Sequence, residues 1–342
     1  MIPAIPPFNS LPIDKSGPPY NAWGLYGSED ELGRLHLITP EAVKRGRDTI
    51  TEGISINLNE NHLEYDVKGS YRVVSRMCSD LLPMNFFPAH PSRKPLEHKI
   101  ICSGHSNDDE LSFNTQSSTQ WDGLKHYPYQ HFPEEGQYRF YNGMTLEEAS
   151  DPSTRKLGIH NFVQKPITSC AHLLDIPLYL SRHSLPPLSP FSASSAISLS
   201  TLIACGEESQ VNIQPGDILI VRTGFTDELL KLSDEERNQL RKREVNGSCG
   251  VTHGKDILKW HWEKGIAAVV ADCPSYEAWP SQQLTAHQVF ISGWGLPIGE
   301  LFDLAELAKK CEEIRRWTFL FTSMPLNVIG GIASPPNAQA IL

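Results

Sequence analysis

The sequence predicts an α/β protein built on a mixed β-sheet with flanking helices. One indication is the unbroken apolar run at residues 266–271, because a strand covered on both faces is continuously hydrophobic. A second is the apolar segment at 218–221, which leads into a turn at Gly224. A helical pattern separates these two segments, and this strand, helix, strand order favours a mixed sheet covered by helices.

The other elements follow from local signals. Thr39, Pro40 and Glu41 mark the start of a helix, since threonine caps it, proline suits its first position and an acid suits its first turn. Alternating apolar and polar residues after Gly53 predict a half-buried strand. Residues 68–110 show no steady period and predict loops with short strands. Three later segments predict a helix at 196–208, a helix at 254–265 with Ile257, Trp260, His261 and Lys264 along one side, and a strand at 317–323.

Two regions are expected in the chain. Residues 1–20 form a Pro-rich arm draped over the surface or a partner, and residues 21–342 form a single domain. A formal net charge of -10 disfavours binding to a phosphate backbone, so nucleic acid is not an expected partner. Seven scattered cysteines without a C-x-x-C pair indicate a reduced compartment. No apolar stretch is long enough for a membrane span, and a cytoplasmic location without membrane contact is expected.

Common catalytic motifs are absent: there is no Walker loop, G-x-G-x-x-G, G-x-S-x-G or H-E-x-x-H. The candidates that remain are separated acidic and imidazole side chains, namely Asp122, His126, Asp272, His287 and Glu300. The first two lie in SSTQWDGLKH, a turn-rich stretch typical of the rim of a pocket. A turn or helix cap is the common alternative for Asp272, and a solvated helix start for Glu300. His253 and His261 are interpreted as surface or core residues and left out of the site.

Six segments of the chain, in one order, resemble the kynurenine formamidase-like metal-dependent hydrolases, also called the cyclase family, and specifically their longer fungal and bacterial branch. The similarity runs from about Trp23 to the C-terminus. The segments are WGLYGSEDELGRLHLITPE, SSTQWDGLKH, PGDILIVRTGF, EKGIAAVVADCPSYE, TAHQVFISGWGLPIGELFDL and FTSMPLNVIGGIASPPNA. The resemblance implies the swivelling β/β/α-like fold of that family and a catalytic domain at 21–342.

The family's metal signature is H-x-G-T-H-x-D-x-P-x-H, and residues 116–126, QSSTQWDGLKH, are its counterpart. The matching positions are Thr119, Asp122 and His126. Gln116 and Gln120 stand where the family has two histidine ligands, and Leu124 replaces the proline. A neutral amide oxygen is a poorer zinc ligand than imidazole, so one metal rather than two is expected.

The resemblance assigns roles to these residues. Asp122, with His287 and Glu300 at the family's later ligand positions, would hold one divalent ion, zinc or manganese, with Gln116 and Gln120 as weaker ligands. His126 would be the general acid/base, assisted by Asp122, because histidine titrates at about pH 6.5 and transfers protons near neutrality. The reaction implied is hydrolysis of an amide, ester or lactone bond.

Two alternatives stay open. Gln116 and Gln120 could hydrogen-bond Asp122 and His126 directly, leaving a metal-free cyclase, dehydratase or isomerase of a biosynthetic, secondary-metabolite intermediate, in which His126 and Asp122 move protons. The chain could also be a ligand-binding protein that has lost catalysis.

Aromatic residues near the motif suggest a flat, largely apolar small molecule as the substrate. Trp23 lies where the family has an aromatic residue near its substrate, and Trp121 and Tyr127 flank the motif. For the remaining candidates a core position is preferred: Trp260, Trp262 and Trp317. By resemblance the chain is expected to form a homodimer or homotetramer.

Overall fold

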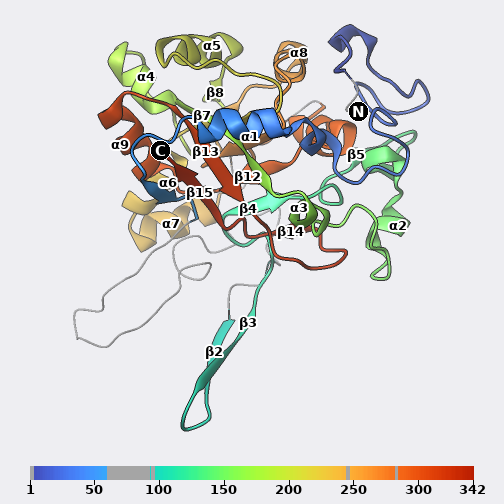
Figure 1. Cartoon of the computed structure of the whole chain (residues 1–342), viewed down its shortest axis with the longest axis horizontal. Helices are drawn as coiled ribbons and strands as arrows, with labels where there is room; N and C mark the ends of the chain where they lie inside the picture. Colours follow the sequence, from blue (N-terminus) through green and yellow to red (C-terminus); the bar gives the residue numbers. More distant parts are fainter. Residues whose placement is uncertain (1–3, 60–92, 94–96, 244–246, 282–283) are drawn as a thin grey trace.

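A mixed nine-stranded sheet organises the protein in the computed structural model, which describes residues 4–59, 93, 97–243, 247–281 and 284–342 (Figure 1). Its order is β1-β15-β13-β7-β9-β11-β12-β4-β14. The strands span Ser55–Asn57 (β1), Ala338–Ile341 (β15), Thr318–Ser323 (β13), Ile167–Asp175 (β7), Ile218–Arg222 (β9), Ala268–Ala271 (β11), Ile298–Glu300 (β12), Gln120–Asp122 (β4) and Ala333–Ser334 (β14). β7, β9, β11 and β12 run parallel, and the remaining neighbours pair antiparallel.

Helices and three small strand pairs surround this sheet. The helices span Pro40–Arg47 (α1), Leu146–Ser150 (α2), Asn161–Gln164 (α3), Ile176–Arg182 (α4), Leu199–Glu208 (α5), Phe225–Lys231 (α6), Asp234–Arg241 (α7), Lys255–Glu263 (α8) and Ala305–Ile314 (α9). The small pairs are β10–β8 (Gly250–Val251, Ala196–Ile197), β2–β3 (Glu97–Cys102, Asn107–Ser112) and β5–β6 (Tyr129–Gln130, Tyr138–Arg139). Short 3₁₀ turns occupy Phe8–Ser10 (η1), Gly33–Leu37 (η2) and Tyr141–Gly143 (η4), and a π-helical turn occupies Gln288–Gly293 (η5).

The predicted α/β class is confirmed, and several elements lie where the sequence signals place them. α1 begins at Pro40, and Thr39 Oγ1 accepts a hydrogen bond of 3.3 Å from the Ala42 amide, as an N-cap does. The apolar run at 268–271 is β11, which is buried at every position between β9 and β12. The run at 218–221 lies in β9, which ends before the turn at Gly224.

Other elements differ from the prediction. The strand after Gly53 is only three residues long, because it pairs with a single neighbour, β15, at the edge of the sheet. Of the tryptophans expected in the core, Trp262 and Trp317 are buried, whereas Trp260 is only partly buried, and Lys264 on the same predicted helix is exposed. The Trp262 indole donates a hydrogen bond of 2.7 Å to the Pro6 carbonyl in the arm.

The Pro-rich arm packs on the body of the protein from residue 4 onward. Phe8 is 1% exposed and stacks on Tyr20 with ring centroids 5.4 Å apart. The arm contacts α8 through η1. Its apolar side chains therefore belong to the core, while the division into arm and single domain stays a prediction.

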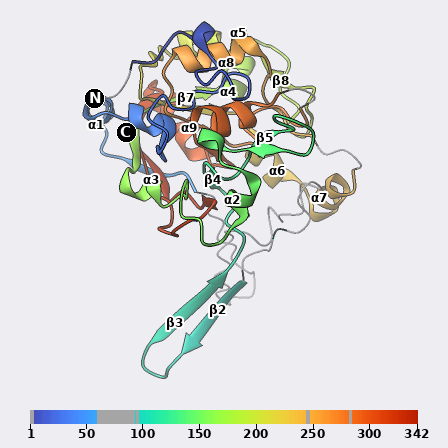
Figure 2. The same ribbon diagram turned by 90° about the vertical axis from the view of Figure 1, so that its right-hand side faces the viewer.

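The β2–β3 hairpin extends away from the body in both views (Figures 1 and 2). Most of it lies within the stretch 68–110, for which short strands are predicted, and β3 continues to Ser112. Residues 68–92 and 94–96 lie outside the described part of the chain. No helix among the described residues is both long and apolar enough to cross a bilayer.

His261 on α8 leads to a prediction about acid stability. It is 0% exposed, its Nδ1 lies 2.8 Å from the Ile257 carbonyl, and its Nε2 lies 2.7 Å from the Tyr276 hydroxyl. Burial lowers its pKa from 6.5 to about 4. The unfolded chain therefore binds the proton more tightly, and this residue's contribution to the free energy of unfolding is lost as the pH falls from 6.5 to about 4.

At about 1.4 kcal/mol per pKa unit, that loss amounts to about 3 kcal/mol. We expect His261→Gln to flatten the pH dependence of stability over this window, as measured by urea unfolding at several pH values. A variant whose stability falls as steeply as that of the wild type would show that another group causes the loss.

Candidate active site

Two strands far apart in the sequence bring two carboxylates together. β4 pairs antiparallel with β12, and Glu300 lies opposite Gln120. Since side chains alternate along a strand, Gln120 and Asp122 share one face and Trp121 points to the other. Glu300 shares the face of Gln120, because directly opposite residues do. Asp122 and Glu300 are 0% and 5% exposed, so both acidic groups are buried at this point.

Two glutamine amides donate hydrogen bonds to Asp122, and one of them also donates to Glu300. Gln120 Nε2 donates to Asp122 Oδ1 at 3.1 Å and to Glu300 Oε2 at 2.8 Å. Gln116 Nε2 donates to Asp122 Oδ1 at 2.9 Å and lies 2.7 Å from His126 Nδ1. The side-chain amides thus act as donors to Asp122, as in the direct hydrogen bonding that the sequence leaves open.

His287 reaches the same centre from another part of the chain. It immediately precedes the π-helical turn η5, and such turns are frequent at functional sites. Its Nε2 lies 3.0 Å from Glu300 Oε1 and 3.9 Å from Asp122 Oδ2. Its Nδ1 lies 2.8 Å from Glu277 Oε1. The imidazole therefore sits between one carboxylate outside the cluster and two within it.

The buried charges strongly perturb one another. Burial and the nearby charge of Asp122 raise the pKa of Glu300 to about 8. Burial alone would lower the pKa of His287, but hydrogen bonds to Glu277 and Glu300 outweigh burial and raise it to about 10. Burial alone would likewise raise the pKa of Glu277, but hydrogen bonds from His253 and His287 lower it to about 2. The carboxylates thus carry more negative charge than one imidazole can balance, and a proton or a cation is needed.

His126 and Tyr127 lie at the more open side of this group. The side chain of His126 is 16% exposed, whereas those of Asp122, His287 and Glu300 are 0%, 7% and 7% exposed. Its Nε2 lies 3.8 Å from Asp122 Oδ1. The Tyr127 ring packs edge-on against His287 with centroids 5.4 Å apart, so it lies beside the cluster. Of these imidazoles, His126 is better placed to meet a molecule from solvent.

Trp121 and Trp23, the other two aromatic residues predicted to contact a substrate, lie on the opposite face of β4 and beside η5. Strand alternation turns the Trp121 ring to the opposite face of β4, where it packs edge-on against Phe302 and Phe321, and its role as a substrate contact stays a prediction. Trp23 is 8% exposed and donates through its indole to the Ser292 carbonyl at 2.7 Å, which ties it to η5. It is therefore near the turn that follows His287, and its role as a substrate contact stays a prediction.

Asp272 has the common alternative role considered above. Its oxygens accept hydrogen bonds of 2.7–2.8 Å from the Thr223 amide, the Thr223 hydroxyl and the Gly224 amide. These groups form the turn from β9 into α6. Asp272 therefore fastens a turn and is not part of the cluster.

The cluster fits one divalent cation. One ligand atom from each of Asp122, His287 and Glu300 lies within 4.8 Å of the others. Within the described part of the chain, Asp122 Oδ2 and Gln120 Oε1 are buried without a hydrogen-bond partner. An unsatisfied buried carboxylate oxygen is costly, and a cation would relieve that cost. Carboxylate oxygens and one imidazole suit zinc or manganese.

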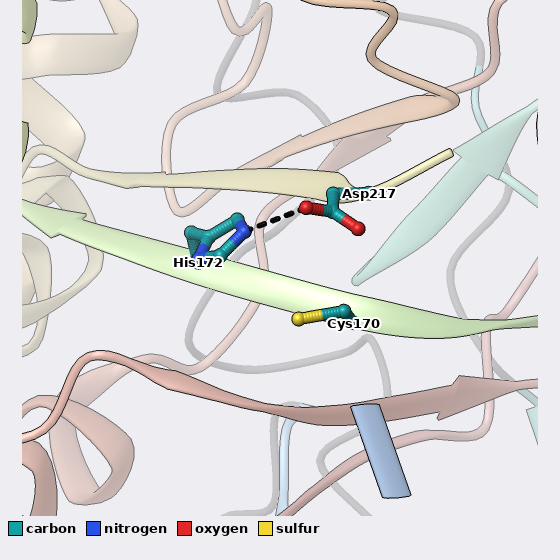
Figure 3. Close-up of side chains that lie close together, drawn as sticks. All are labelled: Cys170, His172 and Asp217. Carbon is teal, nitrogen blue, oxygen red and sulfur yellow. Dashed lines mark hydrogen bonds and ion pairs between the residues drawn. The ribbon is translucent and has the colours of Figure 1, made fainter. Parts of the chain in front are cut away.

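A second buried group of possible metal ligands differs from the cluster, because its imidazole and its carboxylate already have partners. Cys170 and His172 on β7 lie beside Asp217, which precedes β9 (Figure 3). His172 Nε2 lies 2.9 Å from Asp217 Oδ2, and its Nδ1 lies 2.9 Å from the Thr318 hydroxyl. Asp217 Oδ1 accepts 2.7 Å from Arg45, a cation already in place. Because the ring nitrogens of His172 and the carboxylate oxygens of Asp217 have partners, we interpret Cys170, His172 and Asp217 as a group that stabilises the fold, called the structural lock below.

Comparison with known proteins agrees with this geometry. A family model described as "Putative cyclase" matches residues 54–278, more than half of the chain. The chain belongs to the cyclase family. The match includes Asp122 and His126 and ends before His287 and Glu300.

Solved structures share the cyclase fold. A crystal structure titled as a novel cyclase is 26% identical, with a TM-score of 0.76 over 94% of this chain and 99% of that one. Isatin hydrolase A from Labrenzia aggregata is 14% identical, with a TM-score of 0.54 over 84% of this chain and 93% of that one. Isatin hydrolase A from Ralstonia solanacearum is also 14% identical, with a TM-score of 0.52 over 88% and 97%. No curated protein matches the sequence.

Sequence reasoning missed two residues of this cyclase-family site. Glu277 is fully buried against His287, and His253, set aside as a surface or core residue, lies 2.9 Å from Glu277 Oε2. A lone acid in CPSYEAW carries no periodic or motif signal. The available hint was that Glu277 ends one of the six segments that resemble the family.

Proposed function

We propose that this cyclase-family protein is a metal-dependent hydrolase that cleaves an amide, ester or lactone bond in an aromatic small molecule. The observation that carries the proposal is the buried cluster of Asp122, Glu300 and His287, in which one carboxylate oxygen has no partner among the described residues. A pair of carboxylates that share an imidazole and lack a balancing cation is a typical setting for a divalent ion.

Asp122, His287 and Glu300 would hold the ion. When bound, a divalent ion lowers the pKa of water toward neutrality and polarises the substrate carbonyl. His126 acts at the open side of the cluster as general acid/base and gives a proton to the leaving nitrogen or oxygen. Gln116 keeps the His126 ring beside Asp122, since its amide contacts both. Burial of the carboxylates excludes water from the remaining faces of the cluster.

The substrate class has separate support. The Tyr127 ring beside His287 offers an aromatic wall next to the reacting groups. Two structures with this fold are named isatin hydrolases, and isatin is a cyclic aromatic amide. We therefore include isatin, N-formylkynurenine and simple aromatic lactones among the compounds to test.

Metal analysis and chelation test the proposal. We expect about one equivalent of zinc or manganese per chain after purification without chelator, loss of hydrolysis after treatment with EDTA, and recovery when either ion is restored. The measurement combines elemental analysis with product formation on the compounds above. A protein free of metal whose activity does not respond to EDTA would refute the proposal.

A metal-free cyclase, dehydratase or isomerase is the second candidate. The observation in its favour is the donation of both glutamine amides, Gln116 and Gln120, to Asp122. In that case His126 and Asp122 move protons on a bound intermediate without an ion. The same chelation experiment separates the two candidates. The homodimer or homotetramer expected from the resemblance stays a prediction.

A further inference from the structure

The buried carboxylate of Glu277 has four close contacts, two of them with His287. Its Oε1 lies 2.9 Å from the His287 amide nitrogen and 2.8 Å from His287 Nδ1. Its Oε2 accepts from the Ala286 amide at 2.6 Å and lies 2.9 Å from His253 Nδ1. One oxygen thus contacts both the backbone and the ring of His287, which fixes the ring relative to its own main chain.

The chemistry of a carboxylate then decides which nitrogen of His287 carries the proton. An ionised carboxylate only accepts hydrogen bonds, so His287 Nδ1 must be the protonated nitrogen. In the neutral ring, Nε2 then has a free lone pair, and Nε2 is the atom 3.0 Å from Glu300 Oε1. The opposite tautomer would place a proton where a metal ligand is needed.

The backbone of Glu277 is itself fixed. Val251 in β10 donates to the Tyr276 carbonyl and accepts from the Ala278 amide, both at 2.9 Å. Gly250 is so close that a Cβ there would lie 2.4 Å from the carbonyl carbon of Glu277. The carboxylate is therefore presented from a braced segment and not from a free loop.

His253 completes the arrangement on the outer side of Glu277. Its Nε2 lies 2.7 Å from the Ala278 carbonyl and its Nδ1 faces the Glu277 carboxylate, so acceptors flank both ring nitrogens. When the ring is protonated, it forms an ion pair with Glu277 across this 2.9 Å contact. The side chain is 21% exposed, so it closes the site toward solvent.

We propose that Glu277, assisted by His253, is a positioning residue that holds His287 with Nδ1 protonated and Nε2 directed at Asp122 and Glu300. The proposal rests on the proposed metal-dependent function. Glu277 does not touch the reacting atoms; it acts through His287. Such outer partners of a metal-binding histidine typically change metal affinity by about 10–100-fold.

The test uses Glu277→Gln and His253→Gln in the full chain, with Glu263→Gln on the exposed side of α8 as the matched control. Calorimetric titration with Mn²⁺ or Zn²⁺ alone into metal-stripped protein gives the Kd. Two-bond ¹H–¹⁵N spectra of histidine-labelled protein give the tautomer of His287, assigned by its loss in His287→Gln. We expect the Kd to rise about 10–100-fold in E277Q and less in H253Q, and to be unchanged in E263Q.

A wild-type His287 that lacks a proton on Nδ1 in metal-stripped protein would overturn the proposal even if E277Q fails to fold. An E277Q protein with the wild-type Kd and tautomer would also overturn it. If the wild type binds neither ion, the proposed function fails, and the tautomer in wild type and H253Q still decides the role of the Glu277–His253 pair.

Discussion

Replacing His126 by alanine is expected to lower kcat about 10²–10⁴-fold while metal content stays at the wild-type level. His126 is the most exposed imidazole of the cluster, with a side chain 16% exposed, and Gln116 holds it beside Asp122. In the proposed mechanism it supplies a proton to the leaving group without binding the ion. Steady-state kinetics on the best substrate found, combined with elemental analysis, measures both quantities.

Two comparisons make this result specific. His183→Ala removes an exposed imidazole that pairs with Glu208 at the end of α5, and should leave kcat unchanged. The thermal midpoint of both variants should stay near that of the wild type, since neither side chain is fully buried. A fully active His126→Ala protein would remove His126 from the mechanism.

The sequence was informative wherever a signal is local. The cap at Thr39 and the apolar run of β11 depend on neighbours within a few positions, and both elements formed as expected. Alternation along β4 also explains why Asp122 faces the cluster and Trp121 does not. That three-residue strand was not predicted, because it is too short to show a period.

The assembly of the site depends on contacts that no local pattern encodes. Gln120 and Glu300 are separated by 180 positions, and the register between β4 and β12 decides that they share a face. His287 and Glu300 were identified through family resemblance and not from spacing. Glu277 lies at the end of a segment that resembles the family, but no motif assigned it a role, because that role comes from the ring it contacts. Long-range register and supporting side chains are therefore what the sequence leaves undetermined.

The structural lock of Cys170, His172 and Asp217 gives the largest expected effect on stability. Asp217→Ala should lower the free energy of unfolding by about 3–5 kcal/mol, because it leaves buried donors without their acceptor. The side chain of Asp217 is 1% exposed and accepts from Arg45, His172 and the Gln214 amide, so it joins α1, β7 and the start of β9. Figure 3 shows its contact with His172. Urea unfolding of the full chain measures the loss.

Arg45→Ala is the matched partner for this experiment, since it breaks the same ion pair from its outer end. The side chain of Arg45 is 28% exposed, so its removal lets water reach Asp217 Oδ1 while His172 and the Gln214 amide still contact Oδ2, and a loss of only about 1 kcal/mol is expected. The loss of unfolding free energy should therefore be clearly larger for Asp217→Ala than for Arg45→Ala. Equal losses would mean that the surface ion pair, and not the buried hydrogen bonds, accounts for the stability. A much larger loss of unfolding free energy for Asp217→Ala would show that these residues, although of types that bind metals, stabilise the packing of the strands.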